Sequence, residues 1–549
     1  MKSFVRISAL MWGDILVAYA LFVMQNYLTD VWKLSFTHAA GILNIWGGIS
    51  SILPIFFIFL ADAILGNFAM LVISSIAYSL GIGFVTMSTP PVLANSTNTC
   101  KQYEPQCVGH TQKALLYTGM ALIAIGIAGH LVSLHPFLDE QKDKPNHNNS
   151  TRRDCLKLPG FTLMVLIPIV GAIALPYIKP WSVRFGIAAI CTAVATLCFL
   201  TGWRAYDKVK PQGSPLTILC RVFVAAVLKK SQPFPLDAKL IYKKDGEDLQ
   251  SFSGTRFLRC LEKAAVISPD IKLEDQVNNR WRLCSVSEVE DAKTGVRMIP
   301  MWLTFIICGI VSSIGNTYFV EQANHMNRRI GKWNVPLPTL LLLSGWAKSL
   351  FASLASCLLK KSNKYAPSIG IAISMIFSIL CCVTAARIEI RRLRVIARHD
   401  LLDKPEEDIP MSVFWLLFQF SLLAGLDSFF EKSVAAFYDD QSPESMRKYL
   451  GFFTKGVSGL GYVCSVLSVY VVGRVSGKGG KRNWFQFTLS RSRLDRYYWV
   501  LAVLSSVNLL VFILVASCYR YKNREEKRTD EDVVDEGGSG LPAYGNGEG

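Results

Sequence analysis

The sequence predicts an all-α integral membrane protein with 12 transmembrane helices in two six-helix bundles. The first observation is composition, because 51% of the 549 residues are hydrophobic and only 18% are charged, whereas a soluble chain of this length carries more charge. The second is a series of apolar runs of about 20 residues, the length that crosses a bilayer as a helix. The third is their grouping around a long hydrophilic middle. Within the bilayer only helices or closed barrels satisfy their own backbone polar groups.

The apolar runs divide the chain into two similar halves. The predicted spans are 7–29, 39–63, 68–88, 113–134, 160–178, 183–202, 299–319, 336–358, 366–386, 411–437, 449–472 and 497–519. They predict an N-terminal bundle over 1–202, a cytoplasmic linker with amphipathic helices over 203–298, and a C-terminal bundle over 299–520. The first run is long enough to span and lacks a cleavage site, so we expect it to stay in the protein. The polar, Gly-rich tail over 521–549 has almost nothing to bury and is expected to be disordered.

The net charge of +17 does not indicate nucleic-acid binding, and the distribution of the basic residues predicts instead how the chain is oriented in the membrane. The basic residues are spread over connecting loops and do not form one patch, so no nucleic-acid partner is expected. Lysines and arginines concentrate in the segment 203–298, which places that segment in the cytoplasm. The segment 387–398 conflicts with this rule, since it contains five arginines in a loop that twelve spans would place on the other side of the membrane.

The 14 cysteines and seven histidines suggest no metal site or cofactor. Most cysteines lie in predicted spans, where they act as small apolar residues. Cys100 and Cys107 lie instead in a loop predicted to be non-cytoplasmic, beside a glycosylation sequon at Asn95, and a local disulfide is expected there. The histidines form no metal-ligand spacing. The stretch HPFLDE at 135–140 does not support a membrane acyltransferase, because the neighbours that such chemistry needs are missing.

A short loop between the second and third spans carries a family signature. FLADAILGNF at 59–68 places Asp62 and Gly66 four residues apart, and this stretch resembles the loop signature of the major facilitator superfamily. In that signature the acid caps or ion-pairs with neighbouring helices and the glycine permits a tight reversal. Asn67 stands where the basic residue usually follows. A helix-end acid and an ordinary turn glycine would also fit this stretch alone.

Longer motifs extend the resemblance over nearly the whole chain. They are WRAYDKVKPQGSPLT at 203–217, SGTRFLRCLEKAAVI at 253–267, WRLCSVSEVEDAKTGVRMIPMW at 281–302 and SRSRLDRYYWVLAVLSSVNLLVFIL at 490–514. Together they resemble the plant nitrate and peptide transporter family, which belongs to the proton-dependent oligopeptide transporters of the major facilitator superfamily. WGDILVAYALF, NYLTDVWKLSFTHAAGILNIW and STPPVL are most similar to its fifth subfamily.

This resemblance implies a function and a set of partners. It implies a monomeric secondary transporter in the lipid bilayer, with a central site open to alternate sides and usually driven by protons. Family substrates include nitrate, di- and tripeptides, hormones, defence glucosides and nicotianamine, a metal-chelating amino acid. The plasma membrane, the tonoplast and Golgi-derived vesicles all remain open, as do import and export.

The chain departs from the family at its proton-coupling parts. The first span of the family normally carries Glu-x-x-Glu-Arg, and this cluster falls on the residues from Leu10 to Asp14, so that both glutamates are lost and an aspartate replaces the arginine. The lysine of the usual Gly-Ile-Lys-Pro run in the fourth span falls on Leu131, one residue after His130. The resemblance therefore predicts transport in which the standard proton coupling is altered or absent.

Ionisable residues within spans are the candidates for the solute and proton pathway. They are Asp14, His130, Lys348, Asp427 and Glu431, with Lys432 near a helix end. A charge near the bilayer centre costs about 2.5–3.5 kcal/mol on insertion scales, so such residues face a partner or a water-filled cavity. We expect a switchable ion pair, either Asp14 with Lys348 across the bundles or Lys348 with Asp427 within one. The alternatives are a packing role for His130 and a contact of Asp14 with a cytoplasmic loop base.

Polar and aromatic residues of the spans that line the cavity in this superfamily are the candidates for solute contacts. They are Tyr19, Asn44, Trp46, Asn316, Trp346 and Gln419. Such residues also serve as packing or interface residues in membrane proteins. The main hypothesis is a secondary transporter of a small nitrogenous solute, with a zwitterion favoured over nitrate because both charge signs are present. The alternative hypothesis is a transport-inactive sensor or scaffold on the same fold.

Overall fold

The computed structural model describes most of the helical part of the chain. The described residues are 2–90, 92, 108–141, 169–171, 173–178, 180–211, 213–230, 241–243, 258–268, 273–279, 281–360, 364–402, 404, 407–519 and 521. The predicted disulfide of Cys100 with Cys107, most of the predicted span 160–178, and the predicted tail other than residue 521 lie outside them.

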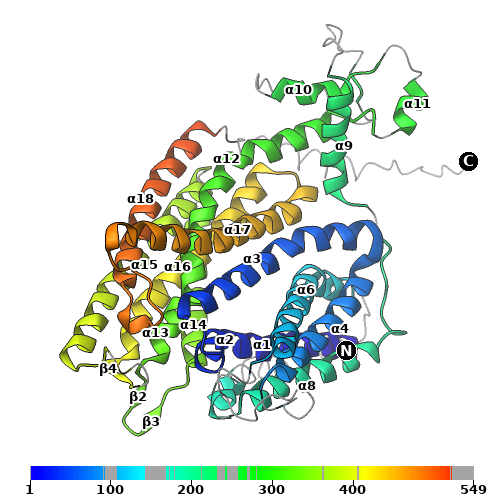
Figure 1. Cartoon of the computed structure of the whole chain (residues 1–549). Helices are drawn as coiled ribbons and strands as arrows, with labels where there is room; N and C mark the ends of the chain where they lie inside the picture. Colours follow the sequence, from blue (N-terminus) through cyan, green and yellow to red (C-terminus); the bar gives the residue numbers. More distant parts are fainter. Residues whose placement is uncertain are drawn as a thin grey trace, which may run out of the picture.

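The described part of the N-terminal half consists mainly of long helices (Figure 1). Its elements are α1 (Lys2–Phe22), α2 (Met24–Asp30), α3 (Phe36–Leu60), the π-helical turn η1 (Ala61–Leu65), α4 (Gly66–Met87), α6 (His110–Glu140), the 3-10 turn η3 (Leu175–Tyr177) and α8 (Trp181–Leu200). Ser35 caps α3, because its side chain accepts a hydrogen bond from the backbone N–H of His38. The chain reverses between η1 and α4 at Gly66, whose φ of 76° suits a residue without Cβ.

The C-terminal half repeats this all-helical construction. Its elements are α12 (Val286–Gly315), α13 (Tyr318–Asn324), α14 (Pro338–Leu359), α15 (Ala366–Arg398), the 3-10 turn η7 (Val413–Trp415), α16 (Leu416–Gln441), α17 (Glu444–Ser476), the 3-10 turns η8 (Lys478–Gly480) and η9 (Leu489–Arg491), and α18 (Leu494–Cys518). Ser285 and Glu288 form a capping box that starts α12. That helix therefore begins 13 residues before the span predicted from 299, inside the predicted linker.

The described residues contain 10 apolar helical segments long enough to cross a membrane. One of them, Phe36–Met87, has 52 residues and reverses at Gly66, so it provides two crossings. The prediction of a multi-pass, mainly helical membrane protein is confirmed. Short strands occur only at one end of the described structure: β1 (Met326–Asn327) pairs with β4 (Ile409–Ser412), and β2 (Arg329–Ile330) pairs with β3 (Trp333–Asn334) in a hairpin.

The linker forms a small cluster at the end of the molecule opposite the β2–β3 hairpin (Figure 1). It contains α9 (Pro215–Leu228), α10 (Arg259–Glu262), the 3-10 turn η6 (Lys263–Ala265) and α11 (Leu273–Asn278), and α9, α10 and η6 pack with the start of α12 on a shared apolar core. The buried Lys293 of α12 binds Glu262 and Glu290 at 2.8 and 2.6 Å. The linker thus packs on the start of α12, ahead of the seventh predicted span.

Lys229 joins two parts of this linker cluster. It is buried at the end of α9, and its ammonium donates to the carbonyl oxygens of Ala264 and Val266 at 3.4 and 2.5 Å. Burial lowers the pKa of Lys229 to about 8, because desolvation disfavours the charged form. The charge of this side chain therefore depends on pH in a mildly alkaline range.

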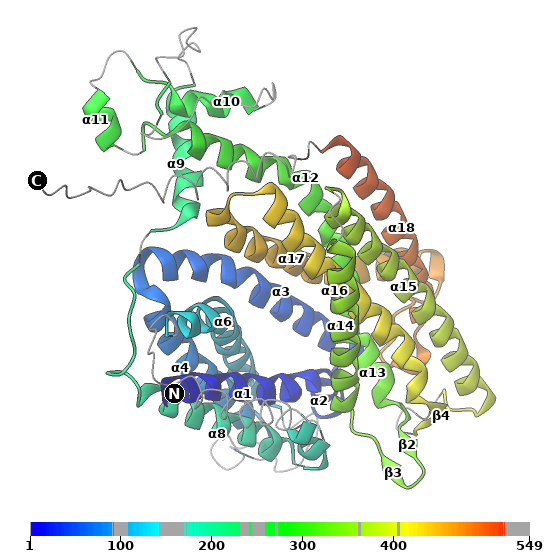
Figure 2. The ribbon, with the colours of Figure 1, turned by 180° about the vertical axis from the view of Figure 1, so that it is seen from behind.

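The two halves meet along α3 and α17. At this crossing, a Cβ added to Gly48 would lie 2.7 Å from the carbonyl oxygen of Gly459, and one added to Gly459 would lie 2.8 Å from that of Gly48. Asn44 of α3 donates to the hydroxyl of Ser465 of α17 at 3.0 Å. The absence of side chains at both glycines lets the two helix backbones touch. Figure 2 shows the same molecule from behind, with α14 beside the region where α1 continues into α2; α1 contacts α14.

Candidate functional site

An ion pair in the C-terminal half joins the middle of two membrane-spanning helices, α14 and α16. Lys348 lies halfway along α14, and its Nζ is 3.8 Å from Oδ2 of Asp427 on α16. The other carboxylate oxygen of Asp427 accepts a hydrogen bond of 2.7 Å from Ser312 of α12. Both side chains of the pair are partly exposed, with fractions of 46% and 37%. A charged pair at this depth that keeps open surface is suited to meet a polar solute.

A pocket of about 240 Å³ lies between α14 and α16 beside this pair. Its lining residues are Gly345, Lys348, Ser349, Ala352, Ser428, Glu431 and Lys432. Glu431 is one turn after Asp427, so the two carboxylates share one face of α16. Ser428 fixes the two helices locally, because its hydroxyl donates to the backbone carbonyl of Lys348 at 2.8 Å. The structure thus brings Lys348, Asp427 and Glu431 together, and it places Lys432 in the same pocket.

The ionisable candidates of the N-terminal half also meet. The Nδ1 atom of His130 on α6 lies 2.9 and 3.0 Å from the two carboxylate oxygens of Asp14 on α1. The Nε2 atom of the same ring lies 2.9 Å from the hydroxyl of Ser75 on α4. His130 is buried, with 5% of its side chain exposed, whereas 30% of the Asp14 side chain is exposed. Three helices therefore contribute to one Asp14, His130 and Ser75 cluster.

The structure distinguishes between the two predicted ion pairs. The pair within one bundle, Lys348 with Asp427, is formed, whereas the pair across the bundles, Asp14 with Lys348, is not formed in this conformation. Asp14 bonds to His130, and the same contact replaces the predicted alternative in which Asp14 meets a cytoplasmic loop base. The physical reason is proximity within the bundle, since α1 and α6 contact each other and bring an acid and an imidazole together.

The predicted solute-contact residues fall into two groups. Asn44 and Gln419 are buried and paired with protein groups: Asn44 with Ser465, and Gln419 with Gln322 at 3.0 Å. Both residues are therefore buried in this conformation, because α3 lies close to α17 and a polar network around α16 takes up the amide N–H of Gln419. Their role at the cavity wall stays a prediction.

The aromatic candidates and Asn316 are placed differently from the two buried amides. The indole N–H of Trp46 donates to the carbonyl oxygen of Met120 at 2.7 Å, and Tyr19 is buried among apolar neighbours that include Leu175. Trp346 and Asn316 are exposed. Asn316 follows the last residue of α12, at the break between α12 and α13. These two residues have the open surface that a solute contact needs.

The loop signature lies at a junction between the two halves. Asp62 accepts a hydrogen bond of 2.6 Å from the hydroxyl of Tyr449 on α17, and Lys448 lies 3.8 Å from its other oxygen. Tyr449 also pairs with Ser214, the N-cap of α9, at 2.8 Å. Asp62, in the turn η1 that follows α3, thus binds α17 of the other half and is linked through Tyr449 to the start of the linker, while Gly66 makes the reversal described above.

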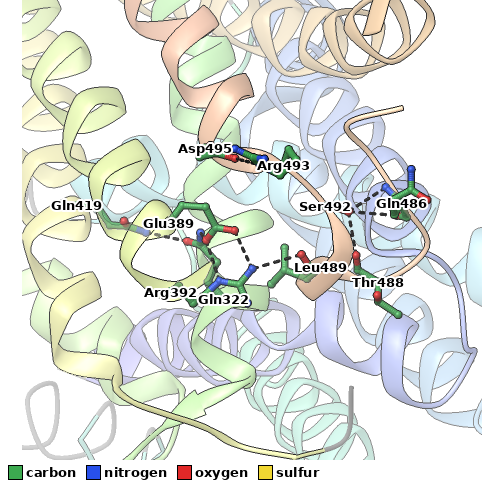
Figure 3. A network of polar contacts seen from close by, with 10 residues as sticks. All are labelled: Gln322, Glu389, Arg392, Gln419, Gln486, Thr488, Leu489, Ser492, Arg493 and Asp495. Atoms are coloured by element: carbon green, nitrogen blue, oxygen red, sulfur yellow. Dashed lines mark hydrogen bonds and ion pairs between the residues drawn. The ribbon is translucent and has the colours of Figure 1, made fainter. Parts of the chain in front are cut away.

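The arginine-rich segment after the ninth predicted span is a helix and not a loop. α15 runs to Arg398, well beyond the predicted end at 386. Figure 3 shows Arg392 of this extension bound to Glu389 through two hydrogen bonds of 2.8 and 2.7 Å. Both side chains are fully buried. The basic residues that conflicted with the predicted orientation therefore include one that is neutralised inside the protein.

This buried pair belongs to a network that sequence reasoning missed. Gln322 of α13 donates to Glu389 at 2.6 Å and accepts from Gln419 of α16 at 3.0 Å, and Arg392 also donates to the carbonyl oxygen of Leu489 at 3.3 Å (Figure 3). The signal was present in the sequence as an acid and an arginine three residues apart, which is a helical spacing. It was missed because the segment was assigned to a loop.

A family model described as the POT family matches residues 68–485. The chain belongs to the POT family. This POT protein is 38% identical to Protein NRT1/ PTR FAMILY 5.5 of Arabidopsis thaliana, over 96% of the chain and 98% of the relative. It is 29% identical to Protein NRT1/ PTR FAMILY 5.6 of the same plant, over 90% and 87%. The predicted family resemblance is confirmed.

Solved structures confirm the fold of this POT protein. An auto inhibited POT family peptide transporter matches with a TM-score of 0.59 and 16% identity, covering 94% of this chain and 98% of that one. A POT family transporter in complex with 5-aminolevulinic acid matches with a TM-score of 0.57 and 12% identity, covering 94% and 95%. The transporter fold of the major facilitator type is therefore shown, and with it a multi-pass membrane protein whose relatives are transporters.

Proposed function

We propose that this POT protein is a secondary transporter of a small nitrogenous zwitterion, such as a peptide or a nicotianamine-like amino acid, by alternating access. The observation that carries the proposal is the Lys348 and Asp427 pair beside the pocket between α14 and α16. A lysine ammonium attracts a carboxylate, and a carboxylate attracts an amine. Opposite charges 3.8 Å apart in a partly open, membrane-embedded position offer one partner to each end of such a solute.

The contacts between the two halves support alternating access. At the end of the molecule that carries the β2–β3 hairpin, Thr29 donates a hydrogen bond to Glu321 and Asn324 donates one to Asp30, both at 3.3 Å. At the opposite end, Asp62 accepts from Tyr449 at 2.6 Å. Each of these contacts consists of one or two hydrogen bonds, and such contacts can be exchanged as the bundles rock about the close crossing of α3 and α17.

A solute with a carboxylate and an amine also agrees with the ligand of a structural relative. That POT family transporter was solved in complex with 5-aminolevulinic acid, which has both groups. Nitrate would use Lys348 alone and would leave the carboxylates of Asp427 and Glu431 without a role in recognition. The standard coupling motif is altered in this chain, so import, export and exchange are all included in the test below.

The second candidate is a transport-inactive sensor or scaffold on the same fold. It is motivated by the loss of both glutamates of the family's first-span cluster, at Leu10 and Gly13. Solute flux distinguishes the two candidates, because a sensor binds its ligand without moving it across the bilayer.

The test is solute flux into liposomes that contain the purified full chain. Nitrate, dipeptides and nicotianamine are each supplied with and without a pH gradient, and empty liposomes measure leakage. Saturable uptake or counterflow of a zwitterion supports the proposal. Saturable uptake of nitrate with none of the zwitterions overturns the substrate class, and binding without any flux supports the sensor.

Two matched variants connect the flux to the proposed pair. In Lys348→Met the solute carboxylate loses its charged partner, and because hydrogen bonds to charged groups contribute about 1.5–3 kcal/mol, we expect KM to rise about tenfold or more. Lys360→Met, at the exposed end of the same helix, removes the same charge away from the pocket and should leave KM within about twofold. Equal effects of the two substitutions would show that Lys348 does not contact the solute.

A further inference from the structure

A second cluster of ionisable groups lies in the other half of the protein, away from the pocket between α14 and α16. Asp14, His130 and Ser75 come from α1, α6 and α4, and their three polar contacts are 2.9 to 3.0 Å long. α1 is packed mainly on α8, and it contacts both α6 and α14. The cluster is therefore centred inside one bundle, on a helix that also borders the other bundle.

The neighbours of the cluster are mostly uncharged. From α4, the ring of Tyr78 meets the imidazole of His130 edge to face at 5.4 Å, and this phenol interacts electrostatically with Asp14. From α8, Thr196 lies 3.4 Å from the carbonyl oxygen of Ser75, and Thr192 packs against the helix position just before Asp14. The titratable groups that face one another here are therefore Asp14, His130 and Tyr78.

The hydroxyl of Ser75 has two acceptors within reach and one proton to give. Its oxygen is 2.7 Å from the carbonyl oxygen of Leu71, four residues earlier in α4, and 2.9 Å from Nε2 of His130. A serine hydroxyl donates one hydrogen bond and can accept others, and its proton rotates to suit its surroundings. Ser75 can therefore donate to the imidazole, or it can donate to Leu71 and accept from the imidazole.

These two orientations satisfy two protonation states of the histidine. Without an added proton, Nδ1–H donates to Asp14 and the Ser75 hydroxyl donates to Nε2. With one proton added, Nδ1–H still donates to Asp14, Nε2–H donates to the Ser75 oxygen, and the hydroxyl turns to the carbonyl of Leu71. No buried polar atom of the cluster loses its partner in either state, whereas an unpaired buried group would cost about 1–3 kcal/mol.

We propose that Asp14, His130 and Ser75 form a reversible proton-binding site that replaces the missing coupling motif of this chain. The bound ligand is one proton, taken up at Nε2 of His130 and balanced by the carboxylate of Asp14. The proposal rests on the proposed transport function and assigns its coupling ion. Asp14 is the more exposed of the two ionisable partners.

Loading and release change the charge at the border between the bundles. The loaded site is an ion pair of net charge zero, and the empty site has the uncompensated charge of Asp14. Because α1 contacts α14, which carries Lys348, release of the proton strengthens the attraction between a carboxylate in one half and an ammonium in the other. Proton binding therefore biases the relative position of the bundles, as coupling requires.

The test measures proton binding and transport separately on the full-length protein. Proton binding is followed by NMR of protein with 15N-labelled histidine in lipid nanodiscs between pH 4 and 9, with the His130 signals assigned by their loss in His130→Gln. Transport is followed in proteoliposomes as uptake driven by a pH gradient and as solute counterflow, which needs no gradient. His135→Gln, an exposed histidine on the same helix, is the matched control.

The proposal predicts a separation of the two transport readouts. Asp14→Asn and His130→Gln should reduce the stimulation by a pH gradient to a ratio of about 1 while counterflow stays within about threefold of wild type. Ser75→Ala removes the acceptor for Nε2–H, so its uptake should need a more acidic pH. His135→Gln should behave as wild type. In the wild type, the His130 signals should move with pH as one proton binds.

Defined results would overturn the proposal. Unchanged gradient stimulation in both Asp14→Asn and His130→Gln would exclude the site as the coupling element, and His130 signals that do not move with pH would exclude it as a proton site. Complete absence of wild-type flux with any solute would instead refute the transport function, and the NMR titration would still decide whether the cluster binds a proton.

Discussion

Removal of Arg392 or of Glu389 alone should destabilise the protein severely. Neither side chain is exposed, and their two hydrogen bonds of 2.8 and 2.7 Å form a bidentate pair. Deleting one partner of a buried ion pair leaves an uncompensated charge and costs about 3–5 kcal/mol. For a bundle of about 200 residues, each kcal/mol corresponds to about 2–4 °C, so Arg392→Met or Glu389→Gln should lower the apparent melting temperature by the order of 10 °C.

The measurement is thermal unfolding of the purified variants in detergent, followed by intrinsic fluorescence. Arg394→Met is the control, because Arg394 is an exposed arginine on the same helix and its loss should change the melting temperature by about 2 °C or less. The double variant of Glu389→Gln with Arg392→Met removes both charges and should recover at least half of the loss. The reasoning is refuted if Arg392→Met is no more destabilising than Arg394→Met, or if the two effects simply add in the double variant.

Three further predictions concern the crossing of α3 and α17, the contact of Asp62 with Tyr449, and the linker. Gly48→Val places a side chain 2.7 Å from a backbone carbonyl oxygen of α17 and should reduce counterflow at least tenfold, whereas Gly83→Val, where a Cβ meets nothing within 4 Å, should not. Tyr449→Phe removes the 2.6 Å hydrogen bond to Asp62, which contributes about 1.5–3 kcal/mol. Spin labels at the linker ends of α4 and α16 should then show a larger population in which these two helix ends are far apart. An unchanged distance distribution would contradict the role of Tyr449 in holding the two halves together. Burial lowers the pKa of Lys229 from 10.5 to about 8, so between these pH values the unfolded chain binds more protons than the folded chain. The folded linker should therefore become more stable, and resist proteolysis better, as the pH rises through that range. Competitive acetylation read by mass spectrometry should give a titration midpoint for Lys229 near pH 8, and a midpoint near that of free lysine would refute its burial.

The sequence predicted the spans because each span is a local property. Twenty apolar residues form a helix in the bilayer whatever else they contact, since the hydrocarbon offers no other partner for the backbone. The same reasoning failed for the ninth span. α15 continues through five arginines to Arg398, and composition alone assigned those residues to a loop. A buried arginine is possible there because Glu389 lies one helical turn away, a pairing that a window of mean hydropathy does not register.

Part of the candidate site also followed from composition. A charged residue inside a span is costly, so Asp14, His130, Lys348 and Asp427 were found by searching for exceptions. Their partners were not decided in this way. The sequence offered two possible ion-pair partners for Lys348, Asp14 and Asp427, and did not decide between them. It also predicted Asn44 and Gln419 on the cavity wall, whereas the fold buries both side chains. A helix face of a membrane protein can point to lipid, to a neighbour or to a cavity, and the apolar pattern is similar for all three.

The sequence by itself determined that this is a multi-pass helical membrane protein of the POT family, because spans and motifs are read from neighbouring residues. Only the tertiary structure decided that Asp14 meets His130, 116 residues away, and that the ring's other nitrogen meets Ser75. Those contacts depend on how α1, α4 and α6 pack, and packing is fixed by the shapes of three helices together. The hydroxyl that can satisfy either protonation state of the histidine is a property of that packing.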